Sequence, residues 1–120
     1  MNKMIKLLLS LFLIAAAPLA LACNYPPPPK NLPDGASATK EEMLAGVKKI
    51  ASYQETMSEY LTCIEADEVV ATQALADDDE AGKKQLKSMS NKKYNAAVDE
   101  QSRAVELFNA EIRAYKARSK

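Results

Sequence analysis

Two stretches of this chain repeat apolar residues in alternating steps of four and three, a pattern typical of helices that pack along their length. The first comprises Met43, Val47, Ile50, Gln54, Met57, Leu61 and Ile64, and the second comprises Tyr94, Val98, Gln101, Val105, Phe108, Ile112 and Tyr115. Two such helices joined by a short turn must run antiparallel. The patterns therefore predict an all-α fold, a long coiled-coil-like hairpin of two antiparallel helices.

Local signals indicate where the two helices begin and end. Thr39 followed by Glu42 has the spacing of a capping box, which predicts the start of the first helix. Three consecutive aspartates begin the most turn-like stretch, and one of them is expected to cap the second helix. Gly82 is an alternative end for the first helix. We expect a helical hairpin over 39–120, with helix one at about 39–76, a turn at about 77–82 and helix two at about 83–117.

Each apolar pattern contains one glutamine, and the pair suggests a register. Placing Gln54 opposite Gln101 also places Leu61 opposite Tyr94. A register displaced by one heptad would separate the glutamines, and the sequence leaves it open. Facing glutamines in an apolar seam can hydrogen-bond and fix the register, whereas at the edge of the seam both would be half solvated. We take Gln54 and Gln101 as a candidate register pair.

The first 22 residues have the layout of a secretory signal peptide. Lys3 and Lys6 provide a basic start, an apolar run follows from Leu7 to Ala17, and small residues precede Cys23. The run is shorter than the roughly 20 residues of a membrane-spanning helix. We expect 1–22 to be removed, so that the mature part of this 120-residue chain is one small domain, periplasmic or secreted.

Cys23 and Cys63 are the only cysteines, and two interpretations of Cys23 compete. In the first, the two form a disulfide in an oxidising compartment. In the second, Cys23 is the acylated first residue of a membrane-anchored lipoprotein, and Cys63 is a lone thiol. A lipoprotein signal usually has leucine three residues before the cysteine and a small residue two before it, but Ala20 and Leu21 stand here in the reverse order. The disulfide is favoured, and the lipid anchor stays the alternative.

Residues 23–38 are rich in proline and are expected to be extended. Polyproline II rises about 3.1 Å per residue, so a segment of about 16 residues reaches close to 50 Å. This is long enough to run back along helix one and meet Cys63. Tyr53, Thr56, Tyr60 and Cys63 line one face of that helix, where prolines pack well on tyrosine rings. We predict that 23–38 is a segment strapped along helix one over the face of Tyr53, Thr56 and Tyr60.

The composition argues against an enzyme. There is no histidine, so imidazole bases, Cys/His and Ser/His/Asp systems and histidine metal ligands are excluded. No glycine-rich phosphate loop or CxxC motif is present, and two cysteines alone do not make a zinc site. We expect no catalytic residue, no metal site and no cofactor.

The net charge and the length of the mature chain indicate which partners to expect. Without Lys3 and Lys6 the chain has 14 basic and 16 acidic residues, a net charge of −2, which gives no general attraction to nucleic acid or anionic lipid. Two helices bury only one stripe, so a chain of this size is marginal. A homodimer is therefore a candidate assembly, through a face carrying Leu44, Ala51, Ala97 and Ala104.

Several short segments at both ends of the mature chain carry a resemblance to known proteins. They are Cys23, Pro33-Asp34-Gly35, residues 38–43, Tyr60-Leu61-Thr62-Cys63 and Phe108-Asn109. With these segments the chain resembles a group of short, uncharacterised exported helical proteins of Gram-negative bacteria. The resemblance implies a helical periplasmic protein with a relation between Cys23 and Cys63, and it supplies no substrate. The sequence thus predicts a soluble interaction or structural module of the cell envelope, with an unknown envelope protein or a second copy as its partner.

Overall fold

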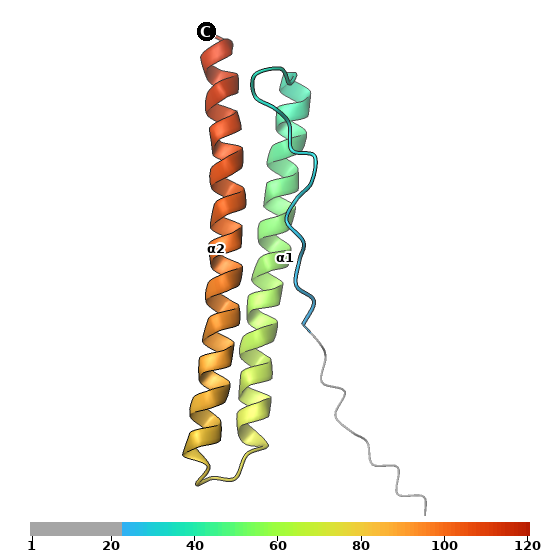
Figure 1. The fold of residues 1–120 in the computed structure, drawn as a ribbon. Helices are drawn as coiled ribbons and strands as arrows, with labels where there is room; N and C mark the ends of the chain where they lie inside the picture. Colours follow the sequence, from blue (N-terminus) through green and yellow to red (C-terminus); the bar gives the residue numbers. More distant parts are fainter. Residues whose placement is uncertain (1–22) are drawn as a thin grey trace, which may run out of the picture.

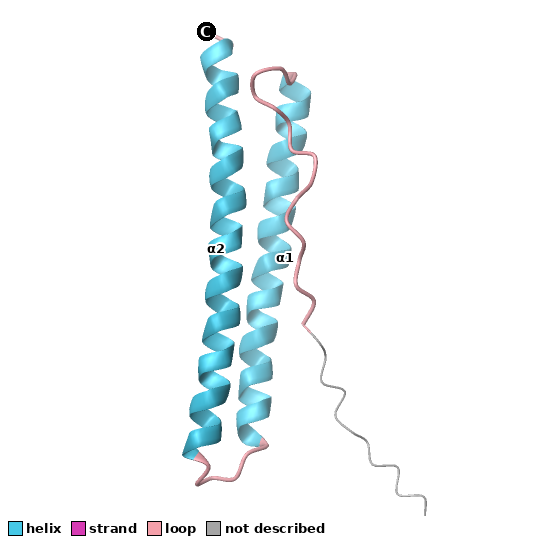
Figure 2. Ribbon diagram, in the orientation of Figure 1, coloured by secondary structure: helices cyan, strands magenta, loops and turns pink. Residues whose placement is uncertain are grey.

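The computed structural model describes residues 23–120, and the expected signal peptide, 1–22, lies outside this range. Two helices run antiparallel, α1 over Lys40–Gln73 and α2 over Glu80–Arg118 (Figure 1). Residues 23–38 form an extended segment, called the strap below, that lies beside α1 (Figure 2). The predicted all-α hairpin with an extended proline-rich segment is confirmed. Neither of these helices is long and apolar enough to cross a membrane.

The start of α1 follows from its capping box. The Thr39 hydroxyl accepts a hydrogen bond from the Glu42 backbone N–H at 3.2 Å, and the Glu42 carboxylate accepts one from the Thr39 N–H at 2.7 Å. Both donors would otherwise be unsatisfied at the helix N-terminus. The predicted capping box is therefore confirmed, and it fixes the point where the strap turns into α1.

The turn between the helices comprises residues 74–79 and lies three residues earlier than the sequence indicated. Asp79 is the N-cap of α2, and its carboxylate accepts from the Gly82 N–H at 2.9 Å. Gly82 therefore lies in the first turn of α2, and the interpretation of this glycine as the end of the first helix is wrong. The prediction that one of the aspartates caps the second helix is confirmed.

Leu61 and Tyr94 pack against the same core cluster, as expected for the register that places them opposite each other. One heptad further toward the turn, Glu68 and Lys87 form an ion pair with an N–O distance of 3.7 Å. A register displaced by a heptad would separate these two side chains. The displaced register left open by the sequence is thereby excluded.

The strap changes which side of each helix is buried. The buried residues of α1 are Met43, Gly46, Ile50, Tyr53, Met57, Tyr60 and Ile64, and those of α2 are Ala97, Ala104 and Phe108. Of the predicted seam, Val47 is 46% exposed and Leu61 is half-buried. The strap contributes a third layer on the tyrosine side of α1, so the core is centred between the strap and both helices. The predicted dimer face is wrong for Ala97 and Ala104, because these alanines are used inside the hairpin.

Candidate functional site

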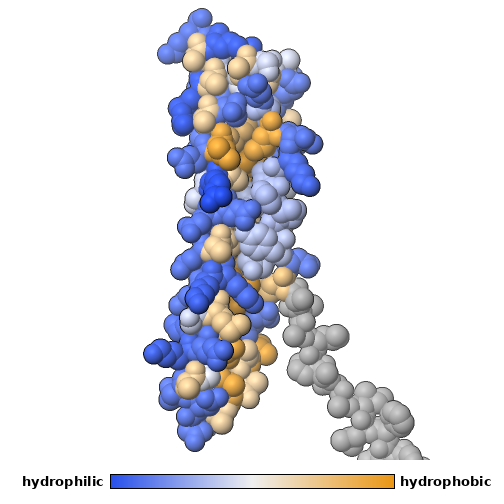
Figure 3. Space-filling view, viewed as in Figure 1, coloured by the Kyte–Doolittle hydropathy of each residue, from blue (hydrophilic) through white to orange (hydrophobic). Residues whose placement is uncertain are grey.

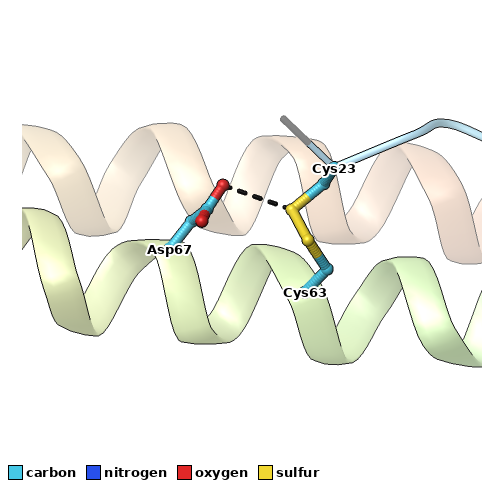
Figure 4. The surroundings of a disulfide bond; sticks show 3 residues. All are labelled: Cys23, Cys63 and Asp67. Atoms are coloured by element: carbon cyan, nitrogen blue, oxygen red, sulfur yellow. Dashed lines mark hydrogen bonds between the residues drawn. A yellow bond between two sulfur atoms is a disulfide. The ribbon is translucent and has the colours of Figure 1, made fainter. Parts of the chain in front are cut away.

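The strap is anchored at its N-terminal end by a disulfide. Cys23 and Cys63 are bonded across 40 residues of chain, with their Cα atoms 5.7 Å apart. Figure 4 shows the bond joining the end of the strap to α1. The bond closes a loop that contains the whole strap and more than half of α1. The structure thus brings together the two cysteines that the sequence paired.

Tyrosines hold the strap next to this anchor. The ring of Tyr25 meets the ring of Tyr60 edge to face, with centroids 5.0 Å apart and planes at 79°. The Tyr25 hydroxyl donates to the Glu100 carboxylate of α2 at 2.6 Å. Tyr53 and Pro26 are buried in the same region. The strap therefore contacts both helices, whereas the sequence predicted contact with helix one alone.

The face of α1 that was predicted to receive the strap carries Tyr53, Thr56 and Tyr60. Tyr53 and Tyr60 are buried, but Thr56 is exposed, and its hydroxyl donates to the Ser52 carbonyl at 2.9 Å. The open depression between strap and helix at this level is lined by Thr56, Tyr53, Ser52, Lys48, Lys49, Lys30 and three prolines of the strap.

The hydroxyl of Tyr53 is buried without a hydrogen-bond partner among the described residues. Burial raises the pKa of Tyr53, and the nearby Glu100 carboxylate raises it further. For Tyr25, burial, the hydrogen bond to Glu100 and the charge of Glu100 all raise the pKa. A single carboxylate on α2, that of Glu100, thus raises the pKa of both phenols.

Replacing the buried phenol should not weaken the fold. We expect Tyr53→Phe to change the free energy of unfolding at neutral pH by between zero and about +1 kcal/mol, because an unsatisfied polar atom is removed. A tyrosine whose folded pKa is raised stabilises the fold below its unfolded pKa of about 10, and this contribution is lost as the pH rises beyond it. Urea denaturation from neutral pH to about pH 11 should show a smaller alkaline loss for Tyr53→Phe than for wild type. A loss above about 1 kcal/mol at neutral pH would show that the hydroxyl has a partner.

The other end of the strap is held by polar groups of α2. The Gly35 N–H donates to the Glu111 carboxylate at 2.7 Å, and Arg118 donates to the carbonyl oxygens of Gly35 and Ala38. A Cβ on Gly35 would lie 1.8 Å from the Glu111 backbone oxygen, so only glycine allows this approach. Sequence reasoning did not find Glu111 or Arg118, because charged residues on a solvated helix carry no signal for one particular contact.

The proposed glutamine pair is not the register device. Gln54 is exposed and Gln101 is half-buried, and no hydrogen bond joins them in the part of the chain described. Rotation of the core toward the strap moves both side chains to the edge of the helix interface. The register is instead held by the apolar packing and by the fit of Phe108 against Gly46, where a Cβ would lie 2.7 Å from the ring.

A carboxylate lies against the disulfide. Asp67 Oδ2 is 3.2 Å from Cys23 Sγ, and the carboxylate points toward the bond (Figure 4). A disulfide sulfur has no hydrogen to donate, so the contact is an electrostatic approach in the oxidised protein. An incoming thiolate would be repelled by this charge, and release of Cys23 as a thiolate would be disfavoured. We therefore expect Asp67 to slow reduction of the disulfide that anchors the strap.

This protection can be measured as a rate. Two unit charges about 4 Å apart in a water-like medium interact by about 1 kcal/mol, so Asp67→Asn should speed reduction by glutathione about 5-fold. The difference should shrink at high salt, because exposed charges are screened. Glu65→Gln, which removes a carboxylate from another exposed position of α1, should leave the rate unchanged. An unchanged rate for Asp67→Asn, measured by chromatography of quenched samples, would contradict the protective role.

Past Cys23, the groove that holds the strap continues toward the turn, and no other residue of 23–120 covers it there. A depression of about 110 Å³ lies there, lined by Ile64, Asp67, Glu68, Ala71, Leu86, Met89, Ser90 and Lys93. Figure 3 shows apolar surface over the helices between the end of the strap and the turn. Met89 is 49% exposed. In the part of the chain that the structure describes, this end of the hairpin consists of the two helices alone, and Met89 is exposed beside the depression.

Comparison with known proteins adds no relative. No protein-family model, no curated protein and no solved structure matches the chain.

Proposed function

We propose that this chain is exported, is cut after Ala22 and acts in the cell envelope as a non-catalytic interaction module. The strapped part of the hairpin is the rigid support. The uncovered part of the groove, between Cys23 and the turn, binds an extended segment of an envelope protein. The observation that carries this proposal is the strap itself, because the same groove already holds an extended segment over most of its length.

The continuity of the groove favours an extended partner over a helical one. The strap packs on tyrosines of α1 and donates and accepts hydrogen bonds along α2. Beyond Cys23 the floor of the groove is apolar, and the charged groups of Asp67 and Glu68 lie on α1 while Lys93 lies on α2. Asp67 and Lys93 can pair with polar groups of a segment laid in line with the strap, while Leu86 and Met89 cover its apolar side chains.

The disulfide supports an exported location, since such bonds persist in oxidising compartments and are rare in the cytosol. It also weighs against the alternative, a lipid-anchored lipoprotein acylated at Cys23. Acylation places a thioether on the same sulfur, so one molecule cannot carry both. The intact mass of the protein recovered from its cell envelope separates the two. A mass equal to that of residues 23–120, which increases by two hydrogens on reduction, supports the strapped form. A mass heavier by a diacylglycerol and an acyl chain overturns it.

The binding surface is tested by photocrosslinking in cells. A photoreactive phenylalanine analogue at Met89 should crosslink to an extended segment of one envelope protein, identified by sequencing of the crosslinked peptide. The same analogue at Ser102, which is exposed on α2 and does not line the depression, should not. Equal crosslinking from both positions, or crosslinks from Met89 only to helical segments, would overturn the proposed mode of binding.

A further inference from the structure

Three ligand-type side chains converge at the anchor of the strap. The sulfur atoms of Cys23 and Cys63 and a carboxylate oxygen of Asp67 all lie within 4.8 Å of one another. Cys63 and Asp67 are four residues apart on α1 and share one face of the helix, a spacing that brings two ligands to one ion. The sequence suggested no metal site because two cysteines are too few, and the fold supplies the third donor.

The oxidised anchor cannot act as a metal ligand set, because thiolates are the binding form. A dithiol reductant converts it: the Cys23–Cys63 sulfur–sulfur bond breaks, each cysteine gains a hydrogen, and the reductant leaves as its own disulfide. The two electrons and two hydrogens come from the dithiol. The product has two thiols beside the Asp67 carboxylate.

The strap has several contacts other than the disulfide that keep Cys23 in place after this reaction. Tyr25 packs on Tyr60 and is hydrogen-bonded to Glu100. At the far end, Gly35 is bonded to Glu111 and Arg118. The two thiols therefore stay close, and a small separation of the sulfurs suffices to admit an ion, whose bonds to sulfur are about 2.3 Å for zinc.

We propose that the reduced anchor binds a thiophilic divalent cation of the zinc type through Cys23, Cys63 and Asp67. Binding converts both thiols to thiolates and releases two protons. Two thiolates and a carboxylate suit zinc, which prefers four donors in a tetrahedron. In the chain cut after Ala22, the amine of Cys23 chelates the same ion as its own sulfur and supplies the fourth donor; this clause rests on the proposed function. The strap is then closed by a disulfide under oxidising conditions and by a metal ion under reducing ones.

Cobalt(II) is the probe, because thiolate ligation gives it a charge-transfer absorption and tetrahedral geometry an intense visible band. The protein recovered from cells is reduced with a phosphine and titrated anaerobically with cobalt chloride. The reduced wild type should bind one ion per chain with both bands, and the oxidised protein should show neither. Asp67→Asn should weaken the affinity at least about 10-fold, and Glu65→Gln should match wild type.

Cys63→Ser should remove most of the charge-transfer band, with circular dichroism confirming that its helices persist. If this variant unfolds, Asp67→Asn still decides the question, since it retains both cysteines and the whole strap. Absence of the charge-transfer band in the reduced wild type overturns the proposal. Equal cobalt affinity for Asp67→Asn and wild type overturns it as well, because the cation would then be held by the thiols alone. Neither result bears on export, which the intact mass reports separately.

Discussion

Cys63→Ser should lower the free energy of unfolding of the oxidised protein by about 3–4 kcal/mol. The physical reason is the loop that the bond closes: Cys23 and Cys63 are 40 residues apart, and cross-linking a loop of this length restricts the unfolded chain by roughly that amount in the chain-entropy model. Urea denaturation followed by circular dichroism measures the change. The variant should keep its helices, because the strap retains its contacts with Tyr60 of α1 and with Glu100 and Glu111 of α2.

The matched control is Thr62→Ser, an exposed neighbour on α1 that should shift stability by less than about 0.5 kcal/mol. Wild type reduced with a phosphine should behave like Cys63→Ser, since both lack the cross-link. A loss below about 1 kcal/mol for Cys63→Ser would mean that the strap is held almost entirely by its tyrosine and polar contacts. The disulfide would then be a minor part of the fold.

The helices and the cross-link could be predicted from the sequence because their signals are local or geometric. The heptad patterns required two antiparallel helices, and the capping box at Thr39 marked the start of α1. The pairing of Cys23 with Cys63 followed from the reach of a proline-rich segment. Each of these inferences uses only residues close together in the sequence or the length of a segment, and a single sequence provides both.

The core could not be predicted correctly because a third layer decides it. A two-helix seam would bury Val47 and place Gln54 near its centre, but the strap shifts the core toward Tyr53 and Tyr60 and leaves Val47 at the edge. Nothing in the periodicity says which side of a seam an extended segment will cover. The turn was placed too late because Gly82 was counted as part of it, whereas this glycine lies in the first turn of α2 and donates to the Asp79 cap.

The candidate site, too, could be predicted from the sequence only in part. Its cysteines were identified, whereas Asp67, Glu100 and Glu111 were not, because each is one of 16 acidic residues with no local distinction. Their roles arise only when the strap brings a sulfur, a phenol or a backbone N–H to them. Contacts between a tail and a helix surface are long-range in sequence, and charge alone does not select them.

Phe108→Ala should be the most damaging substitution in the strapped half of the molecule, with an expected loss of about 3–5 kcal/mol. Phe108 is 3% exposed and packs with Ala38, Met43 and Ile50, so a single ring touches the strap and both helices. Removing it leaves a cavity where the strap enters α1, and collapse there is limited because Gly46 already lies against the ring.

The adjacent Leu107 provides the control. It is 63% exposed on the same turn of α2, so Leu107→Ala should cost less than about 0.5 kcal/mol. Urea denaturation measures both variants, and limited proteolysis reports the strap, whose bonds near Phe108 should be cut faster in Phe108→Ala while the disulfide keeps the fragments joined. Similar losses for the two variants would contradict a three-layer core centred on Phe108. A large loss without faster cleavage of the strap would show that the ring joins the two helices but does not hold the strap.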